Sequence, residues 1–395
     1  MLIITAPGQG AQAPGFLAPW LELPGVTERL GIWSELAKVD LIRAGTTAGA
    51  DDIRDTSVAQ PLLVAAGLIA AAVLDDGDPS KLPADVAAGH SVGELTAGVV
   101  AGVITAEDAM RLVGVRGRAM AAATALTPTG MTAALGGNEP DVLAAIERHG
   151  LTPANINGAG QIVGAGTHAE LDAFAAEPPQ GVRLRKLQVA GAFHTRHMLP
   201  AVAELRAAAA GVTVLDPVTR LLSNADGAAV TTGKEWLERI IAQVASPVRW
   251  DLCMATMRDL GATAIIELPP AGTLTGLAKR AFSSAGTSPQ VLPGNVELLA
   301  VKTPDQLQAA RELIEAHLAD TTEGHGHLPE WRLIVAPASG TFRRGEGRLG
   351  AIVARGGERP VTAPWPTDII EWLAEDGDPV SEGQPLVRVH PREDV

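Results

Sequence analysis

The segment ADVAAGHSVGELTAGVV, residues 84–100, decides the fold. It predicts a short buried strand over Asp85–Ala88 and an apolar helix that begins at Glu94. Between them stands the pattern G-x-S-x-G, Gly89–Gly93, which in α/β proteins holds a serine on a sharp, strained turn with its Oγ projecting outward. The N–H groups and positive dipole end of the following helix then face the group that the serine attacks. Ser91 is therefore a candidate nucleophile, and an ordinary turn is the alternative.

The composition limits the kinds of protein that this chain can be. A chain of 395 residues indicates two or three domains, and 46% hydrophobic residues allow a large core. A formal net charge of −14 argues against a nucleic-acid partner or an anionic membrane. One cysteine, Cys253, excludes an internal disulfide and a cysteine metal site, and it fits a reducing cytoplasm. The N-terminus does not resemble a signal peptide, and the apolar run Leu62–Leu74 is too short to span a bilayer, which predicts a buried helix.

A main body over residues 1–320 is predicted, from a buried strand at Leu2–Thr5 to a helix at Asp305–Leu318. Within it, the pattern of predicted strands and helices changes over residues 126–190, which predicts an inserted βαββαβ, ferredoxin-like subdomain. The strands predicted from Met131 onward are Met131–Leu135, Gln161–Ala165, Val182–Val189 and Thr263–Leu268, and the helices are Glu139–His149, His168–Ala176, Pro200–Ala210 and Glu235–Val244.

The C-terminal part differs from the body. Residues 321–329 are polar and Gly-rich, which is typical of a linker. Residues 330–395 alternate like strands between Gly and Pro turns, and they contain no lysine. The sequence therefore predicts a small all-β module after the linker.

A serine hydroxyl needs a base, and three histidines are candidates. His90 adjoins Ser91, but neighbours on a tight turn normally point apart, which favours a packing role. His194 and His197 stand together in GAFHTRHM, and spacing alone does not choose between them or exclude a satisfied core histidine. Arg116 stands on a predicted helix in an apolar context, which makes it a better candidate for a buried cation than Arg118.

Seven motifs occur in an order that resembles the malonyl-CoA:acyl carrier protein transacylases and the acyltransferase domains of fatty acid and polyketide synthases. The similarity covers about residues 1–318. The motifs are GQGAQ at 8–12, GHSVGE at 89–94, VRGRAM at 115–120, ANINGAGQIV at 154–163, GAFHT at 191–195, SN at 223–224 and QVASPVRW at 243–250. The resemblance implies an α/β-hydrolase-like core with a parallel sheet and an inserted ferredoxin-like subdomain.

The same resemblance implies roles for individual residues. Ser91 matches the nucleophile and His194 the base, which the family holds through backbone carbonyl oxygens instead of an aspartate. The other matches are the oxyanion-hole N–H groups of Gln9 and Val92, and Gln60, Asn157 and Gln243 in or beside the substrate site. No metal or other cofactor is implied.

Two further positions imply the substrate. Arg116 matches the family's carboxylate-binding arginine, and a planar guanidinium can hold the free carboxylate of malonyl with two charge-assisted hydrogen bonds. Phe193 is the bulky residue that accompanies malonyl over methylmalonyl, a preference worth roughly 1–3 kcal/mol. The implied activity is malonyl transfer from malonyl-CoA to the phosphopantetheine thiol of acyl carrier protein. One departure is ELPPAGTL from Glu267, where two prolines replace a Gly-containing turn and put carrier docking near this loop in doubt.

The C-terminal module resembles biotinyl/lipoyl carrier domains in VAPASG at 335–340, VTAP at 361–364 and IIEWLAEDGDPVSEGQPLVRV at 369–389. Without lysine it can carry neither biotin nor lipoate, so we expect a degenerate module used for docking or for stability, with another fatty acid synthesis protein as the candidate partner. A β tail packed on the enzyme is the alternative. A serine hydrolase and a non-enzymatic scaffold also stay open. The pathway, the particular carrier protein and the oligomeric state do not follow from the sequence.

Overall fold

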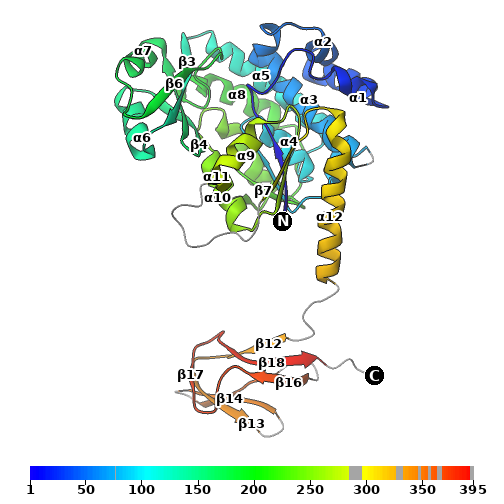
Figure 1. Ribbon diagram of the computed structural model, residues 1–395, viewed down its shortest axis with the longest axis vertical. Helices are drawn as coiled ribbons and strands as arrows, with labels where there is room; N and C mark the ends of the chain where they lie inside the picture. Colours follow the sequence, from blue (N-terminus) through cyan, green and yellow to red (C-terminus); the bar gives the residue numbers. More distant parts are fainter. Residues whose placement is uncertain are drawn as a thin grey trace. The chain divides into compact units, whose positions relative to one another are not determined.

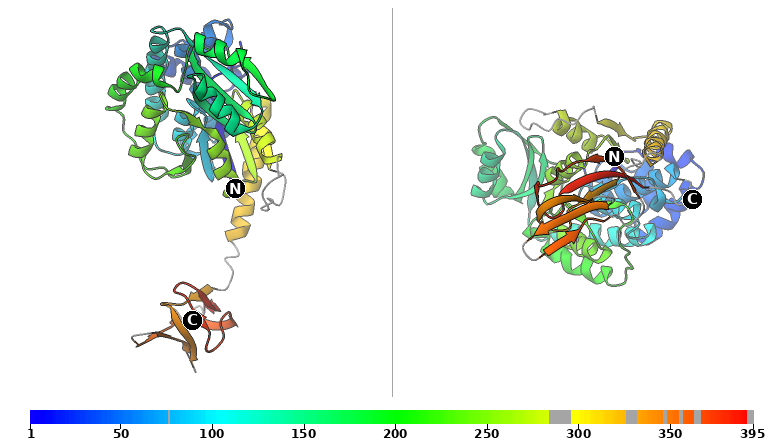
Figure 2. Two further views of the ribbon diagram at one scale, coloured as in Figure 1. Left: turned by 90° about the vertical axis from the view of Figure 1, so that its left-hand side faces the viewer. Right: turned by 90° about the horizontal axis from the view of Figure 1, so that it is seen from below.

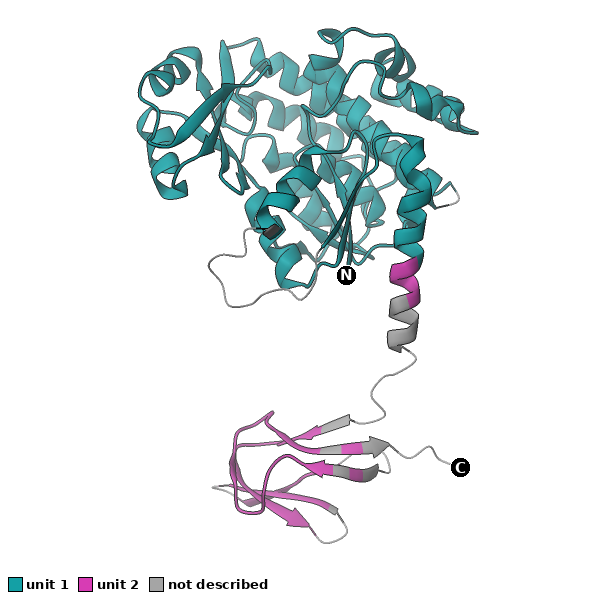
Figure 3. Ribbon diagram, in the orientation of Figure 1, with its two compact units in different colours: residues 1–315 teal, residues 316–395 magenta. Residues whose placement is uncertain are grey.

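The computed structural model describes residues 1–75, 77–283, 296–325, 332–345, 348–354, 357–362 and 367–391. They form two compact units, Met1–Glu315 and Ala316–Val395 (Figure 3). The boundary falls inside helix α12, Leu307–His325. The expected linker over 321–329 is therefore wrong for residues 321–325, which are helical, and its remainder lies outside the described residues. Polar residues do not end a helix, and a single interior glycine costs only about 1 kcal/mol.

The first unit is built on a six-stranded sheet in the order β11-β10-β1-β2-β7-β8. Helices pack on both faces of this sheet (Figures 1 and 2). All neighbours are parallel except β7 and β8. The strands are β1 Leu2–Ala6, β2 Val86–Gly89, β7 Arg220–Leu222, β8 Ala229–Val230, β10 Ala264–Glu267 and β11 Glu297–Ala300. The parallel α/β core predicted from residues 84–100 is confirmed.

Strand β1 has the continuous apolar sequence of a strand that is covered on both faces. Leu2 and Ile4 face a large cluster that includes α3, α4 and α5, whereas Ile3 faces a second cluster with α10 and α11. The helices of this unit are α1 Val26–Ala37, α2 Leu41–Thr46, α3 Thr56–Leu74, α4 Gly93–Val100, α5 Ala106–Thr124, α6 Glu139–Arg148, α7 His168–Ala176, α8 Leu199–Ala209, α9 Gly233–Gln243, α10 Trp250–Asp259 and α11 Thr273–Ser283.

Helix α3 contains the long apolar run seen in the sequence. By length and composition it is the one described helix that could cross a membrane, but 83% of its most apolar window is buried inside the protein. It packs in the main core, as predicted, because its side chains are apolar all round.

The inserted subdomain is a second sheet in the order β6-β3-β5-β4-β9. Its first four strands and helices α6 and α7 have the βαββαβ order and the antiparallel pairing of a ferredoxin-like fold, as predicted. The strands are β3 Thr129–Gly136, β4 Thr152–Gly158, β5 Gln161–Thr167, β6 Val182–Lys186 and β9 Val248–Arg249. Strand β9 comes from outside the insert and pairs parallel with β4, an extension too short for the sequence pattern to reveal.

The departure at ELPPAGTL leaves a well-anchored loop. Glu267 is fully buried at the end of β10, and its carboxylate accepts hydrogen bonds from the N–H groups of Gly272, Leu274 and Thr275 at 2.8–2.9 Å. The carboxylate therefore caps the N-terminus of α11, a favourable place for negative charge.

The second unit beyond α12 is all-β, as predicted, with two antiparallel sheets in the orders β12-β18-β16 and β15-β14-β13-β17. Phe342 and Ile352, both fully buried, lie in its small core. The strands are β12 Arg332–Val335, β13 Gly340–Gly345, β14 Arg348–Ala354, β15 Gly357–Pro360, β16 Thr367–Trp372, β17 Pro379–Val380 and β18 Pro385–Pro391.

Candidate active site

Ser91 lies on a strained turn between β2 and α4. Its φ of 53° is in the left-handed region, which a non-glycine residue adopts at a cost of roughly 1–3 kcal/mol. A Cβ on Gly89 would stand 2.0 Å from the carbonyl carbon of Gly93, and one on Gly93 would stand 2.2 Å from the carbonyl oxygen of Ala6. Only glycine fits at both positions, which explains the G-x-S-x-G pattern in physical terms.

His194 meets the serine from a distant part of the chain. Its Nε2 lies 2.7 Å from Ser91 Oγ, and its Nδ1 lies 2.8 Å from the backbone carbonyl oxygen of Gln243. The carbonyl accepts the Nδ1 proton, so Nε2 carries the lone pair that faces the serine. His194 also has a positive φ, 62°, so both partners sit on strained backbone.

The other two candidate histidines do not reach Ser91. The ring of His90 packs against Trp250 with centroids 5.7 Å apart, and its Nε2 lies 2.8 Å from Asn157 Oδ1. The backbone N–H of His197 bonds the Thr195 hydroxyl, and its ring makes no described hydrogen bond with the serine. The geometry thus selects His194.

Burial, together with the nearby positive charge of Arg116, lowers the pKa of His194 to about 3. The imidazole is therefore neutral at pH 7, which is the form that can accept a proton from the serine hydroxyl.

Arg116 lies on α5 with its guanidinium buried, at 2% exposure. Nη1 donates to Gln60 Oε1 at 2.5 Å, and Nη2 donates to Gln243 Oε1 at 2.9 Å and lies 3.5 Å from Ser91 Oγ. Both firm acceptors are neutral amides, and among the described residues no carboxylate forms an ion pair with it. Burial lowers its pKa to about 10, so the group stays charged at pH 7 and can take an anionic ligand beside the serine.

Gln9 and Val92 line the same pocket as Ser91. The hydrogen bonds of the described residues include none that uses either backbone N–H, so both remain available as donors. The side chain of Gln9 is fixed by Arg54 O at 3.0 Å and by the Thr56 hydroxyl at 2.8 Å. Free N–H groups at this position suit an oxyanion.

The pocket lies between the main body and the inserted subdomain. Phe193, which is almost fully buried, lies in its wall. The lining residues are Gln9, Gln60, His90, Ser91, Val92, Arg116, Met120, Met131, Asn155, Val163, Leu187, Val189, Phe193 and His194. Apolar walls with a few convergent polar groups are typical of a small-molecule site.

Two residues expected at the substrate lie behind this lining. Asn157 bonds His90 and the Gln161 side chain, and Gln243 acts through Arg116 and His194. Asn155 also lines the pocket, although it was not among the residues expected there from the sequence, and its buried Oδ1 has no hydrogen-bond partner among the described residues. Residues two apart on a strand share a face, a signal that pointed to Asn155 once Asn157 was singled out.

No group of three or more His, Cys, Asp or Glu among the described residues could hold a metal ion. Cys253 is buried, and burial raises the pKa of its thiol far above the usual range. A buried, protonated thiol is not a nucleophile.

The chain is similar to known proteins over the unit that carries this site. A family model described as the acyl transferase domain matches residues 33–322. A malonyl CoA-acyl carrier protein transacylase of Mycobacterium bovis is 48% identical over 300 residues, 76% of this chain and 99% of that protein. The Escherichia coli protein of the same name is 31% identical over 314 residues, 78% of this chain and 97% of that protein.

Solved structures agree. The crystal structure of MCAT from Mycobacterium tuberculosis has a TM-score of 0.72 and 48% identity, and the match covers 78% of this chain and 98% of that one. An acyl carrier protein S-malonyltransferase from Vibrio cholerae has a TM-score of 0.69 and 30% identity, covering 78% and 99%. Fold and site thus define an acyltransferase built on a serine elbow. Within that class, the chain belongs to the malonyl CoA-acyl carrier protein transacylase family.

Proposed function

We propose that this chain transfers a malonyl group from malonyl-CoA to the phosphopantetheine thiol of acyl carrier protein through an ester on Ser91. The observation that carries the proposal is the position of Ser91 Oγ, 2.7 Å from His194 Nε2 and 3.5 Å from Arg116 Nη2. One hydroxyl thus has a neutral base on one side and a buried cation on the other.

In the first half-reaction, Ser91 Oγ attacks the thioester carbonyl and His194 Nε2 takes the hydroxyl proton. The N–H groups of Gln9 and Val92 donate to the oxyanion of the tetrahedral intermediate, and such a donor typically contributes about 2.7–4 kcal/mol. The intermediate collapses by breaking the carbon–sulfur bond, and His194 returns the proton to the coenzyme A thiolate. Malonyl remains as an ester on Ser91.

In the second half-reaction the carrier thiol enters by the same route. His194 takes its proton, the sulfur attacks the ester carbonyl, and the proton returns to Ser91 Oγ as the ester bond breaks. Every bond and proton in the two half-reactions is accounted for by Ser91, His194 and the two thiols, so the reaction as written uses neither a metal nor a redox cofactor. The two half-reactions share one site, so the kinetics are ping-pong.

Arg116 selects the acyl group. A malonyl carboxylate supplies the guanidinium with the anion that its amide partners lack. An acetyl group would leave the desolvated cation unpaired, which costs free energy in proportion to its burial. Phe193 narrows the same pocket and favours malonyl over the branched methylmalonyl group.

Labelling tests this function directly. Malonyl-CoA alone, without carrier protein, should add one malonyl group to the purified full chain, and Ser91→Ala should take up none. Intact-protein mass spectrometry measures the adduct. Addition of carrier protein should then move the label to the carrier; release of the label to water would instead identify a hydrolase, and a parent chain that is never labelled would refute the proposal.

The low pKa of His194 predicts the pH dependence of labelling. A base is active when unprotonated, so a pKa of about 3 keeps it active through mildly acidic pH. The single-turnover rate at saturating malonyl-CoA should change less than about twofold between pH 5 and 7. A base with the ordinary pKa of about 6.5 would instead lower the rate about 25-fold from pH 7 to pH 5. Rapid-quench mass spectrometry over this range measures the rate, and circular dichroism at each pH verifies folding. A fall with a midpoint near pH 6.5 would contradict the assignment.

For the C-terminal unit, residues 330–395 contain no lysine to which biotin or lipoate could be attached. We propose that this unit serves docking or stability instead, with another fatty acid synthesis protein as the candidate partner. The proposed domain division is an acyltransferase domain over residues 1–320 and a biotinyl/lipoyl-like module over 330–395. The reaction needs no cofactor, and the single reduced cysteine fits a cytoplasmic location.

A further inference from the structure

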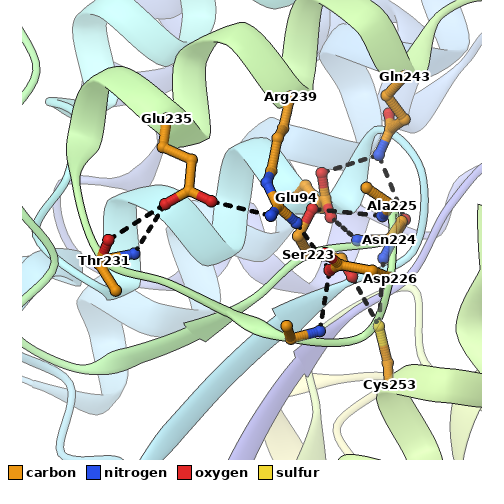
Figure 4. A network of polar contacts seen from close by, with 11 residues as sticks. Glu94, Ser223, Asn224, Ala225, Asp226, Thr231, Glu235, Arg239, Gln243 and Cys253 are labelled. Atoms are coloured by element: carbon orange, nitrogen blue, oxygen red, sulfur yellow. Dashed lines mark hydrogen bonds and ion pairs between the residues drawn. The ribbon is translucent and has the colours of Figure 1, made fainter.

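A buried polar network connects Arg116 to the backbone of Ser91 through Gln243, Glu94 and Asn224. Figure 4 shows the middle of this network, where Gln243 and Asn224 meet Glu94. Glu94 lies in the first turn of α4, three residues after the serine, and is 2% exposed. The proposed mechanism does not use it. A carboxyl group this deeply buried is costly unless its partners compensate it, so its partners indicate its role.

The first partner is the side-chain amide of Gln243. Its Nε2 donates to Glu94 Oε2 at 2.9 Å and lies 3.2 Å from Asn224 Oδ1. Two acceptors on one side of the amide oblige the nitrogen to point toward them. The oxygen then points the other way, where it accepts from Arg116 Nη2 at 2.9 Å. A reversed amide would set its NH₂ group against the guanidinium, donor against donor.

The second partner is Asn224. Its backbone N–H donates to Glu94 Oε1, and its side-chain Oδ1 accepts the backbone N–H of Ser91 at 2.7 Å. Its Nδ2 donates to the carbonyl oxygen of Gly89 at 2.7 Å. The two oxygens of Glu94 therefore hold two different parts of the site, one leading to the guanidinium and one to the nucleophile's turn.

Charge supports the same assignment. Arg239, the other cation near Glu94, forms ion pairs with Asp226 at 2.7 Å and Glu235 at 2.8 Å. Arg116 bonds only amide oxygens firmly, and Glu94 is one amide away from it. Burial raises the pKa of Glu94, whereas the Asn224 N–H and the charges of Arg116 and Arg239 oppose that rise and favour the carboxylate.

We propose that Glu94 is a positioning residue for acyl selection, which fixes the orientation of the Gln243 amide and so presents Arg116 to the substrate carboxylate. The inference rests on the proposed function, because it assumes that a carboxylate binds at Arg116. A role confined to anchoring residues 223–226 against α4 would stabilise the fold equally but would not affect the choice between acyl groups.

The test is Glu94→Gln in the full chain. A glutamine presents one oxygen and one NH₂, so it cannot accept from both Asn224 N and Gln243 Nε2. The Gln243 amide then keeps only the longer of its two acceptors, Asn224 Oδ1 at 3.2 Å, and its orientation is less firmly held. We expect both labelling rates to fall, because the turn of Ser91 is also held, and the malonyl-CoA to acetyl-CoA rate ratio to fall about tenfold or more. Single-turnover labelling of Ser91 with each thioester measures the ratio. Glu235→Gln, at the outer end of the same network, is the matched control and should keep the parent ratio.

An unchanged ratio in folded Glu94→Gln overturns the inference, even if its melting temperature drops. If that variant does not fold, Glu94→Asp replaces it, since the charge is kept while the reach is shortened by one methylene; the same fall is expected, and the parent ratio would again overturn the inference. Failure of the proposed function is distinguishable, because then the parent chain itself would not be labelled by malonyl-CoA.

Discussion

Replacing His194 with alanine should lower the single-turnover rate of Ser91 labelling by about 10⁴-fold. The imidazole is the one base within hydrogen-bond distance of Ser91 Oγ among the described residues, at 2.7 Å. Without it the serine would have to lose its proton to water while it attacks. The N–H groups of Gln9 and Val92 remain, so a residual rate above the uncatalysed reaction should persist.

His197→Ala is the matched control, since it removes an imidazole three residues away that makes no described contact with the serine. Its rate should lie within about twofold of the parent. The rates come from rapid-quench mass spectrometry with saturating malonyl-CoA, and melting temperatures of both variants test folding. Equal losses in the two variants, or a His194→Ala rate within tenfold of the parent, would exclude His194 as the base.

The local parts of the site could be predicted because each of them requires particular residue types at neighbouring positions in the sequence. The serine turn needs glycine where a Cβ would collide with backbone 2.0–2.2 Å away, so its signature is contiguous in the sequence. The parallel sheet needs strands with nearly continuous apolar sequence, which Leu2–Thr5 and Asp85–Ala88 already indicated. The choice of His194 over His197 rests on the family resemblance. Both histidines are about a hundred residues from Ser91 in the sequence, and no local pattern shows which of them reaches the serine in the fold.

The remaining features depend on partners that are remote in the sequence. Gln243 is recognisable as a motif residue, but the direction of its amide follows from Glu94, which is 149 residues away. The short strand β9 exists because β4 offers it an edge, and its two residues carry no periodicity. Helix α12 extends through residues that composition assigns to a linker, because polarity is a weaker signal than the absence of a helix breaker.

Substituting Arg116 with methionine should reverse the acyl preference. Methionine keeps an unbranched apolar stem but is shorter and removes the cation, so the malonyl carboxylate would enter a buried site without a counter-charge. Loss of one partner of a buried charge pair costs about 2–5 kcal/mol, which predicts a fall of about 10²–10³-fold in malonyl labelling. Acetyl labelling should be unchanged or faster, because a desolvated, unpaired cation is no longer present.

Arg118→Met is the matched control, two residues along the same helix, where the exposed arginine bonds the Ala37 carbonyl outside the pocket. It should keep the parent malonyl-CoA to acetyl-CoA labelling ratio, measured on Ser91 by mass spectrometry. An equal fall in that ratio in both variants would contradict the assignment.

The charge of Arg116 also affects the base, which gives a second reason to expect faster acetyl labelling in Arg116→Met. The charge of Arg116 lowers the pKa of His194, so a bound carboxylate that neutralises this charge makes the imidazole a stronger base. Arg116→Met should therefore also raise the pKa of His194 and make it a stronger base in the reaction with acetyl-CoA. A substitution at Arg118 should not have this effect.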